Sequence, residues 1–110
     1  MKIVNRPWGN FKQFVNNKKC TVKLIEVNAR QQLSLQYHKK RGEEWYFLDK
    51  AIVQLGDKKF RVKRGEIIKV QKKKAHRVIA GLRKARFLEI SYGNFNELDE
   101  VRLEDKYGRK

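Results

Sequence analysis

The sequence has very little cysteine, proline and methionine, and it has no long apolar stretch. Among 110 residues it has one cysteine, Cys20, one proline, Pro7, and one methionine. A single cysteine excludes an intramolecular disulfide. No apolar stretch approaches the length of a signal-peptide core or a membrane span. We therefore expect a soluble, cytoplasmic protein with no membrane partner, in which Cys20 is a small buried strand residue rather than a reactive thiol.

Acidic residues are scarce as well. The chain has 28 Lys and Arg against 12 Asp and Glu, which gives a formal net charge of +16. Such a charge attracts phosphorylated metabolites, nucleic acid or acidic surfaces. A composition rich in lysine and glutamate and poor in proline is also typical of heat-adapted proteins, so the charge has two explanations. Because the cations are scattered and no recognised nucleic-acid-binding motif is present, a nucleic acid partner is not expected.

Long helical patterns are missing. No apolar pattern at helical spacing continues for three turns, which leaves at most a short helix within residues 96–100. Short segments rich in β-branched and aromatic residues are present instead, separated by turn-forming residues. We predict one all-β domain over residues 1–110, either a sandwich or a jelly-roll barrel. The predicted strands are 11–15, 20–27, 33–38, 45–48, 51–55, 59–63, 67–70, 78–79 and 87–92.

The segment 33–38 predicts a strand with one apolar and one polar face. A period of two places Ser34, Gln36 and His38 together, opposite Leu33, Leu35 and Tyr37. Glu43 follows a short basic turn, and the second histidine, His76, lies in a segment that can return as a neighbouring strand. An amide, two imidazoles and a carboxylate are a plausible set of metal ligands. The same spacing fits two ordinary strand histidines equally well, and glutamine is an uncommon ligand.

Four groups of residues extend this pattern over nearly the whole chain. They are Arg6-Pro7-Trp8-Gly9; Leu33-Ser34-Leu35-Gln36-x-His38 with Arg41-x-Glu43-x-Trp45; Gly65 to His76-Arg77; and Gly93-x-Phe95 with Glu97-x-Asp99-x-Val101-Arg102-x-Glu104-Asp105-x-Tyr107-Gly108-Arg109. In this order they resemble the cupin superfamily and, within it, the cupin domain of type II mannose-6-phosphate isomerases. The Gln-x-His pair and the closing motif are the specific parts. The resemblance implies a double-stranded β-helix, the jelly-roll barrel of cupins.

The resemblance also implies a site and an activity. One divalent metal would be held by Gln36, His38, Glu43 and His76, with Zn²⁺ as the first choice and Mn²⁺, Fe²⁺ or Co²⁺ also compatible. Arg41 would be the arginine needed for isomerisation, and Arg102 a second pocket arginine. The activity implied is the interconversion of mannose 6-phosphate and fructose 6-phosphate, without the nucleotidyltransferase domain that bifunctional relatives carry upstream.

The sequence departs from the family pattern at several positions. Its general glycines are replaced by Arg30, Lys50 and Lys73, its proline by Gln71, its late asparagine by Ala80, and its rim histidines by Lys39, Lys40 and Glu44. None of these positions is a predicted ligand. The changes therefore bear on the substrate more than on the metal, and the alternative is a metal-binding cupin that acts on another phosphosugar or binds one without turnover.

Isomerisation of an aldose needs a cation, a phosphate site and a base. Negative charge develops on the enediolate oxygens, which a divalent metal stabilises. Lys39, Lys40 and Arg41 are suited to bind a phosphate, although a solvated basic turn explains the two lysines equally well. Glu89 interrupts an apolar strand and, if it points inward, is a candidate proton-transferring base. An inward structural glutamate paired with a cation is the alternative.

Two predictions concern the N-terminal segment. Arg6-Pro7-Trp8-Gly9 is typical of a turn, because Pro fixes one dihedral angle and Gly frees another, and Trp8 is large enough to plug an end of the core. Cupins commonly cover exposed edge strands by pairing two chains. We therefore expect a homodimer, with the segment around Trp8 near the interface.

Overall fold

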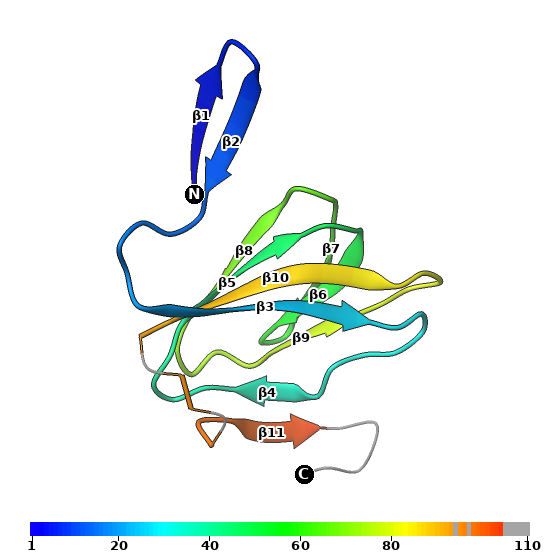
Figure 1. The fold of residues 1–110 in the computed structure, drawn as a ribbon. Helices are drawn as coiled ribbons and strands as arrows, with labels where there is room; N and C mark the ends of the chain where they lie inside the picture. Colours follow the sequence, from blue (N-terminus) through cyan, green and yellow to red (C-terminus); the bar gives the residue numbers. More distant parts are fainter. Residues whose placement is uncertain (94, 97, 105–110) are drawn as a thin grey trace.

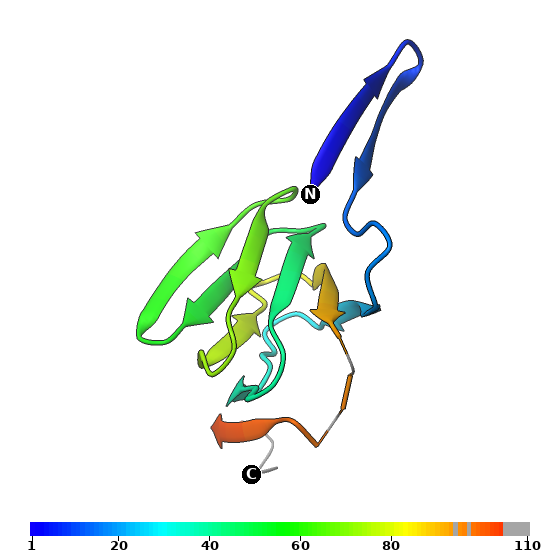
Figure 2. The ribbon, with the colours of Figure 1, turned by 90° about the vertical axis from the view of Figure 1, so that its left-hand side faces the viewer.

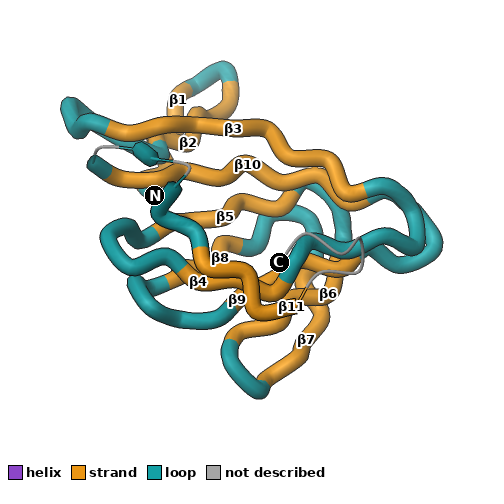
Figure 3. Tube along the Cα trace, turned by 90° about the horizontal axis from the view of Figure 1, so that it is seen from below, coloured by secondary structure: helices purple, strands orange, loops and turns teal. Residues whose placement is uncertain are grey.

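A computed structural model describes residues 1–93, 95–96 and 98–104 as strands, turns and loops (Figure 1, Figure 3). The strands are β1 Lys2–Arg6, β2 Gly9–Gln13, β3 Cys20–Val27, β4 Leu35–Tyr37, β5 Glu43–Phe47, β6 Ala51–Leu55, β7 Lys58–Val62, β8 Ile67–Val70, β9 His76–Ile79, β10 Ala85–Tyr92 and β11 Val101–Glu104. The all-β prediction is confirmed. In the described part of the chain, no helix has the length and apolarity needed to cross a membrane.

The body of the protein consists of two antiparallel sheets. One has the strand order β3-β10-β5-β8, and the other has the order β11-β4-β9-β6-β7. From β3 to β11 the chain repeatedly crosses from one sheet to the other, and only the hairpin of β6 and β7 stays within one sheet (Figure 1, Figure 2). This winding brings β4, β5 and β9, which carry the predicted ligands, together around one interior.

The core lies between the two sheets and is built from alternate residues of their strands. Trp45 and Phe47 of β5 are at most 1% exposed, and the ring centroids of Phe47 and Phe87 are 5.2 Å apart. Val53 and Val78, register partners on β6 and β9, are fully buried from the other sheet. Each such side chain contributes roughly 1.5–3 kcal/mol through burial. These contacts fix the spacing of the sheets on either side of the ligands.

The outer face of β5 is covered by the segment that precedes β3. Tyr46 points away from the core and meets Phe14 edge-on, with ring centroids 5.0 Å apart. This contact explains why β5 carries an apolar ring on its outer face as well as on its core face. Cys20, at the start of β3, is half-buried and free.

The N-terminal residues form a separate hairpin rather than part of the sandwich. Strands β1 and β2 pair with each other, and their turn at Pro7 and Trp8 lies far from both sheets (Figure 1, Figure 2). The prediction that Trp8 plugs the core is therefore wrong, because the hairpin carries this side chain away from the body and leaves it 74% exposed. The predicted strand 11–15 is instead Gly9–Gln13, and β1 was not predicted.

Arg30 and Lys73, which replace glycines of the predicted family pattern, have the positive φ that glycine adopts most easily. Arg30 has φ +63° and Lys73 has φ +64°, a left-handed conformation that costs most residues about 1–2 kcal/mol. At both positions the backbone N–H is used: Arg30 donates to the carbonyl of Gly81 at 2.7 Å, and Lys73 to that of His38 at 2.6 Å. The second bond ties the loop before β9, which leads into His76, to the loop after β4, which begins with His38.

Candidate metal centre

Three of the four predicted metal ligands converge between the sheets. Potential ligand atoms of His38, Glu43 and His76 all lie within 4.8 Å of one another. Their residues are 3%, 3% and 1% exposed. His38 follows β4, Glu43 begins β5 and His76 begins β9, so both sheets contribute to the cluster. The convergence predicted from spacing is therefore present in the fold.

Backbone carbonyls orient both imidazoles. His38 Nδ1 lies 2.7 Å from the carbonyl oxygen of Asp99, and His76 Nδ1 lies 2.8 Å from that of Lys74. A carbonyl only accepts hydrogen bonds, so each Nδ1 carries a proton, and in the neutral ring each Nε2 then presents a lone pair. This second hydrogen bond is typical of metal-binding histidines. Sequence analysis missed Asp99 in this role, because its contact with His38 spans 61 positions along the chain.

His76 has the clearest opening for a cation. Its Nε2 is buried and has no hydrogen-bond partner among the residues that the structure describes. An unsatisfied buried acceptor costs about 1–3 kcal/mol, which a bound cation would recover. Burial also lowers the pKa of His76, so the ring is held in the neutral form that binds metals. The donor set and this lone pair together fit a divalent metal.

Glu43 is held by three donors. Its Oε1 accepts from Trp45 Nε1 at 3.2 Å, and its Oε2 accepts from Ser91 Oγ at 3.2 Å and from Arg41 Nε at 3.0 Å. These contacts fix the carboxylate next to His38, whose Nε2 is 3.6 Å from Oε2. Sequence reasoning did not identify Ser91 or Trp45, although a buried serine in the apolar strand β10 was an available signal.

Gln36 lies on the face that carries the ligands, yet its amide has another partner. It is the register partner of His76 across β4 and β9, so the two side chains share one face. With its nitrogen toward Glu100, the amide donates to the two carboxylate oxygens at 2.7 and 3.0 Å. Sequence analysis did not single out Glu100. The position of Gln36 as a fourth ligand remains a prediction.

Arg41 lies inside the ligand cluster rather than on its rim. The residue is 5% exposed. Besides Glu43, its guanidinium contacts the carbonyl of Asn96 through Nη1 at 3.0 Å and His38 Nε2 through Nη2 at 3.4 Å. Its Cζ lies 4.4 Å from the ring centroid of Phe95. No local pattern indicates this burial, since Arg41 follows two exposed lysines.

Lys39 and Lys40 belong to a loop whose backbone is fixed and whose side chains are exposed. Both backbone N–H groups donate to the carboxylate of Asp99, at 2.9 and 3.0 Å. Burial has the largest single effect and raises the pKa of Asp99, but these two hydrogen bonds together with the nearby His38 and Arg41 outweigh it, so the pKa of the carboxyl group is lowered. Asp99 therefore holds the backbone of this loop, and the exposed side chains of Lys39 and Lys40 follow His38 directly in the chain.

The two remaining predicted site residues lie on inward or ligand-bearing faces. Glu89 is half-buried and is the register partner of Trp45 and Lys23, which puts it on the same face of β10 as Ser91. Arg102 is the register partner of Gln36, and its Nε lies 2.8 Å from the carboxylate of Glu100. The family-motif residues Glu97, Asp105, Tyr107, Gly108 and Arg109 lie outside the described residues.

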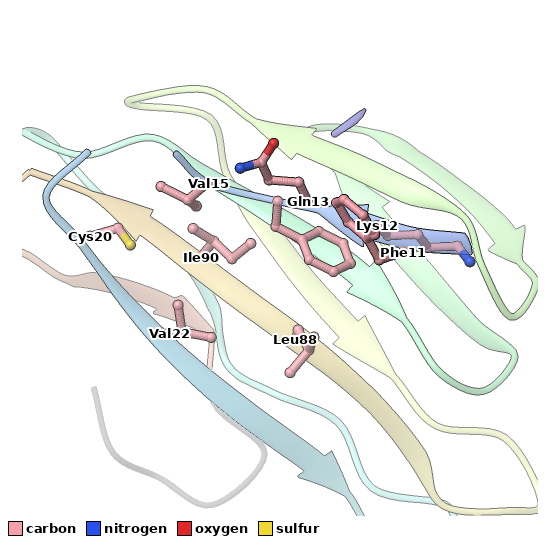
Figure 4. A pocket seen from close by; sticks show the side chains of 9 residues that line it. Phe11, Lys12, Gln13, Val15, Cys20, Val22, Leu88 and Ile90 are labelled. Carbon is pink, nitrogen blue, oxygen red and sulfur yellow. The ribbon is translucent and has the colours of Figure 1, made fainter. Parts of the chain in front are cut away.

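A pocket of about 440 Å³ lies elsewhere, on the outer side of the sheet that contains β3 and β10 (Figure 4). Its lining comes from β2, the segment after it, β3 and β10, and includes Phe11, Phe14, Val22, Leu88 and Ile90. Leu88 and Ile90 line this pocket on the outer face of β10, so Glu89 between them lies on the opposite face. The pocket is apolar and contains none of the metal-centre residues.

Comparisons with known proteins agree with this architecture. A family model described as mannose-6-phosphate isomerase C-terminal matches residues 1–105. Mannose-1-phosphate guanylyltransferase 2 of Escherichia coli O157:H7 is 34% identical over 107 residues, which are 94% of this chain and 22% of that protein. The chain thus spans about a fifth of that relative's length.

Two solved structures show the fold. A protein with a double-stranded β-helix domain from Klebsiella pneumoniae matches with a TM-score of 0.69 and 16% identity, covering 83% of this chain and 80% of that one. Bacillus subtilis oxalate decarboxylase, whose structure was used to study its Mn(II) centres, matches with a TM-score of 0.69 and 22% identity over 78% of this chain and 24% of that one. The predicted double-stranded β-helix is confirmed.

Proposed function

Because the chain belongs to the family of mannose-6-phosphate isomerase C-terminal domains, we propose that it is a metal-dependent isomerase that interconverts mannose 6-phosphate and fructose 6-phosphate. The observation that carries this proposal is the buried cluster of His38, Glu43 and His76, in which two Nε2 lone pairs and a carboxylate converge. Removal of a proton beside a carbonyl places negative charge on neighbouring oxygens, and a divalent cation at this cluster would stabilise that charge.

The ligand set supports a borderline metal. His38, His76 and Glu43 would supply two nitrogens and one oxygen, and Gln36 would complete the set with its amide oxygen. Zn²⁺ accepts this mixture readily, and Mn²⁺, Fe²⁺ and Co²⁺ also accept imidazole with carboxylate, so we propose Zn²⁺ first and the other three as alternatives. Because the amide nitrogen of Gln36 faces Glu100, the carbonyl oxygen would be the atom of this side chain that binds the metal.

The remaining site residues divide the other tasks. Lys39 and Lys40, exposed on the loop that Asp99 holds, would bind the substrate phosphate. Arg41 is buried beside the ligands, which supports a role at the reacting oxygens rather than at a phosphate on the rim. Glu89, on the inward face of β10, would move the proton between the two carbons. Arg102, next to Gln36 in register, would be a second cation of the pocket.

A second candidate function rests on the rim. The exposed Lys39 and Lys40 stand where the family has histidines, and the E. coli relative is a guanylyltransferase of which this chain matches 22%. A different phosphosugar, or binding of one without turnover, would use the same metal cluster. Binding without turnover would leave a phosphosugar affinity that depends on Lys39 and Lys40 in a protein that forms no product.

The deciding experiment is a coupled assay on protein stripped of metal and reloaded with Zn²⁺ or Mn²⁺. We expect mannose 6-phosphate to give fructose 6-phosphate, a chelator to abolish the reaction, and added metal to restore it. His38→Ala serves as the inactive control. Loaded wild-type protein that leaves mannose 6-phosphate unchanged would overturn the isomerase assignment, and phosphosugar binding by that protein would establish the second candidate.

We also propose a homodimer. The hairpin of β1 and β2 exposes Ile3, Trp8 and Phe11, and the outer face of β3 exposes Val22 and Leu24, each 55% accessible. An isolated two-stranded hairpin is marginally stable in water, and apolar residues on an edge strand favour association. A second copy of the chain would cover both surfaces.

A further inference from the structure

The guanidinium of Arg41 uses the lone pairs that a metal would need. His38 has a single lone pair on Nε2, because its Nδ1 proton is bound to the carbonyl of Asp99, and Arg41 Nη2 lies 3.4 Å from that Nε2. Glu43 Oε2, the carboxylate oxygen that lies 3.6 Å from His38 Nε2, accepts from Arg41 Nε and from Ser91 Oγ, which occupy both of its lone-pair directions, whereas Oε1 accepts only from Trp45 among the described residues. Only His76 Nε2 in this cluster has no partner among the described residues.

We propose that Arg41 is an internal competitor for the metal site, and that metal binding displaces its guanidinium from His38 and Glu43. The two cations are alternatives because one lone pair cannot serve both a donor hydrogen and a metal. This inference rests on the metal centre of the proposed function but not on isomerase activity. The competition by Arg41 lowers the metal affinity of the site. Its displacement frees the arginine for the substrate once the metal is bound.

The rest of the contacts of Arg41 explain how the exchange is possible. Its Nη1 donates to the carbonyl of Asn96, and its Cζ lies over the ring of Phe95. Neither partner is a candidate ligand, so both contacts can persist while the bonds to His38 and Glu43 break. The guanidinium then stays beside the metal centre and is held by the segment between β10 and β11. A positive charge kept there has oxyanions as its natural partners.

The competition predicts a measurable change in metal affinity. Displacing a charge-assisted hydrogen bond between buried groups corresponds to roughly a tenfold to hundredfold change in an equilibrium constant. Arg41→Met keeps the apolar stem and removes the donors and the charge. We expect isothermal titration with Zn²⁺ to give a Kd at least about tenfold lower for Arg41→Met than for the wild type. An equal or higher Kd would overturn the proposal.

Arg86→Met is the matched control. Arg86 is also an ion-paired arginine, with Nε 2.8 Å from Asp49 Oδ2, but Asp49 lies after β5 and is not part of the ligand cluster. The Kd of the Arg86→Met variant for Zn²⁺ should equal that of the wild type. If both arginine variants bind Zn²⁺ more tightly by the same factor, the effect is a general loss of positive charge and the proposal fails.

A second measurement uses the wild-type protein and needs no substitution. In ¹⁵N-labelled wild-type protein, the Nε–H resonance of Arg41 should move when Zn²⁺ saturates the site, because its acceptor Glu43 Oε2 is lost. A resonance that stays in place at saturation overturns the displacement. Isomerase failure is distinguishable: inactive loaded protein with a tighter-binding Arg41→Met variant removes the proposed function and leaves this inference intact.

Discussion

Ser91→Ala tests whether the carboxylate of Glu43 is positioned by its neighbours for metal binding. Ser91 is 1% exposed, and its hydroxyl donates to Glu43 Oε2 at 3.2 Å. Alanine removes this donor without adding volume. The site is too well buried for bulk water to replace the hydroxyl, so the carboxylate loses one of its three donors.

The size of the effect follows from which donors remain. Without metal, Trp45 and Arg41 still hold Glu43 after the substitution. If metal displaces Arg41, only Trp45 remains in the loaded protein, so Ser91 contributes more to the loaded state than to the unloaded state. Loss of an outer hydrogen bond to a metal ligand typically weakens binding about 10- to 100-fold. We expect a Zn²⁺ Kd about tenfold higher for Ser91→Ala, together with about 1–3 kcal/mol less free energy of unfolding.

The assay is isothermal titration of metal-free protein with Zn²⁺, paired with urea unfolding. Thr21→Val is the control, because Thr21 is the register partner of Ser91 on β3 and, in the described part of the chain, makes no hydrogen bond to Glu43. It should leave the Kd unchanged. A Ser91→Ala variant that binds Zn²⁺ as tightly as the wild type would refute the argument that this hydrogen bond orients the ligand.

Four further predictions follow from the same structure. His38→Ala should lower bound metal and isomerase activity together, as measured by elemental analysis and the coupled assay, since it removes a ligand; full metal content would contradict its assignment. Burial lowers the pKa of His76, so below about pH 6.5 the unfolded chain binds a proton that the folded chain does not. The free energy of unfolding should therefore fall as the pH is lowered, by at most about 1.4 kcal/mol per pH unit. Urea unfolding at two pH values checks this, and unchanged stability would refute it. Lys73→Gly should raise the free energy of unfolding by about 0.5–1 kcal/mol, because φ at Lys73 is +64°, whereas Lys72→Gly should not. Light scattering should give a dimer mass for the wild type and a smaller mass for Trp8→Ser, and a monomeric wild type would count against the proposed interface.

Local pattern was sufficient for much of the fold. The strands Cys20–Val27, Ala51–Leu55 and Ile67–Val70 are found with the predicted bounds. β-branched residues between polar boundaries define such segments without reference to the rest of the chain. The two N-terminal strands were less accessible, because β1 and β2 pair only with each other and have little apolar periodicity to bury. Strand β11, Val101–Glu104, was missed because it is short and mostly exposed.

The site was predictable only at the level of ligand types. Period-two alternation put Gln36 and His38 on one face, the residue pattern offered Glu43 and His76 as further ligands, and the resemblance supported the same four residues. The environment of these ligands depends on contacts between distant segments, which no local pattern contains. The burial of Arg41 is the clearest example, since its neighbours in sequence are exposed lysines while its contacts with Asn96 and Phe95 come from a segment more than 50 positions away.

That distant segment, between β10 and β11, connects the metal centre to the rim. The carbonyl of Asp99 orients His38, its carboxylate fixes the backbone of Lys39 and Lys40, and Asn96 and Phe95 hold Arg41. A ligand, two candidate phosphate-binding residues and the arginine thus depend on one connection. Because these contacts reach the site from a single segment, displacement of that segment would disturb metal binding and substrate binding together. The positions of the ligand His38 and of the rim lysines therefore both depend on the contact between this segment and the loop that follows β4.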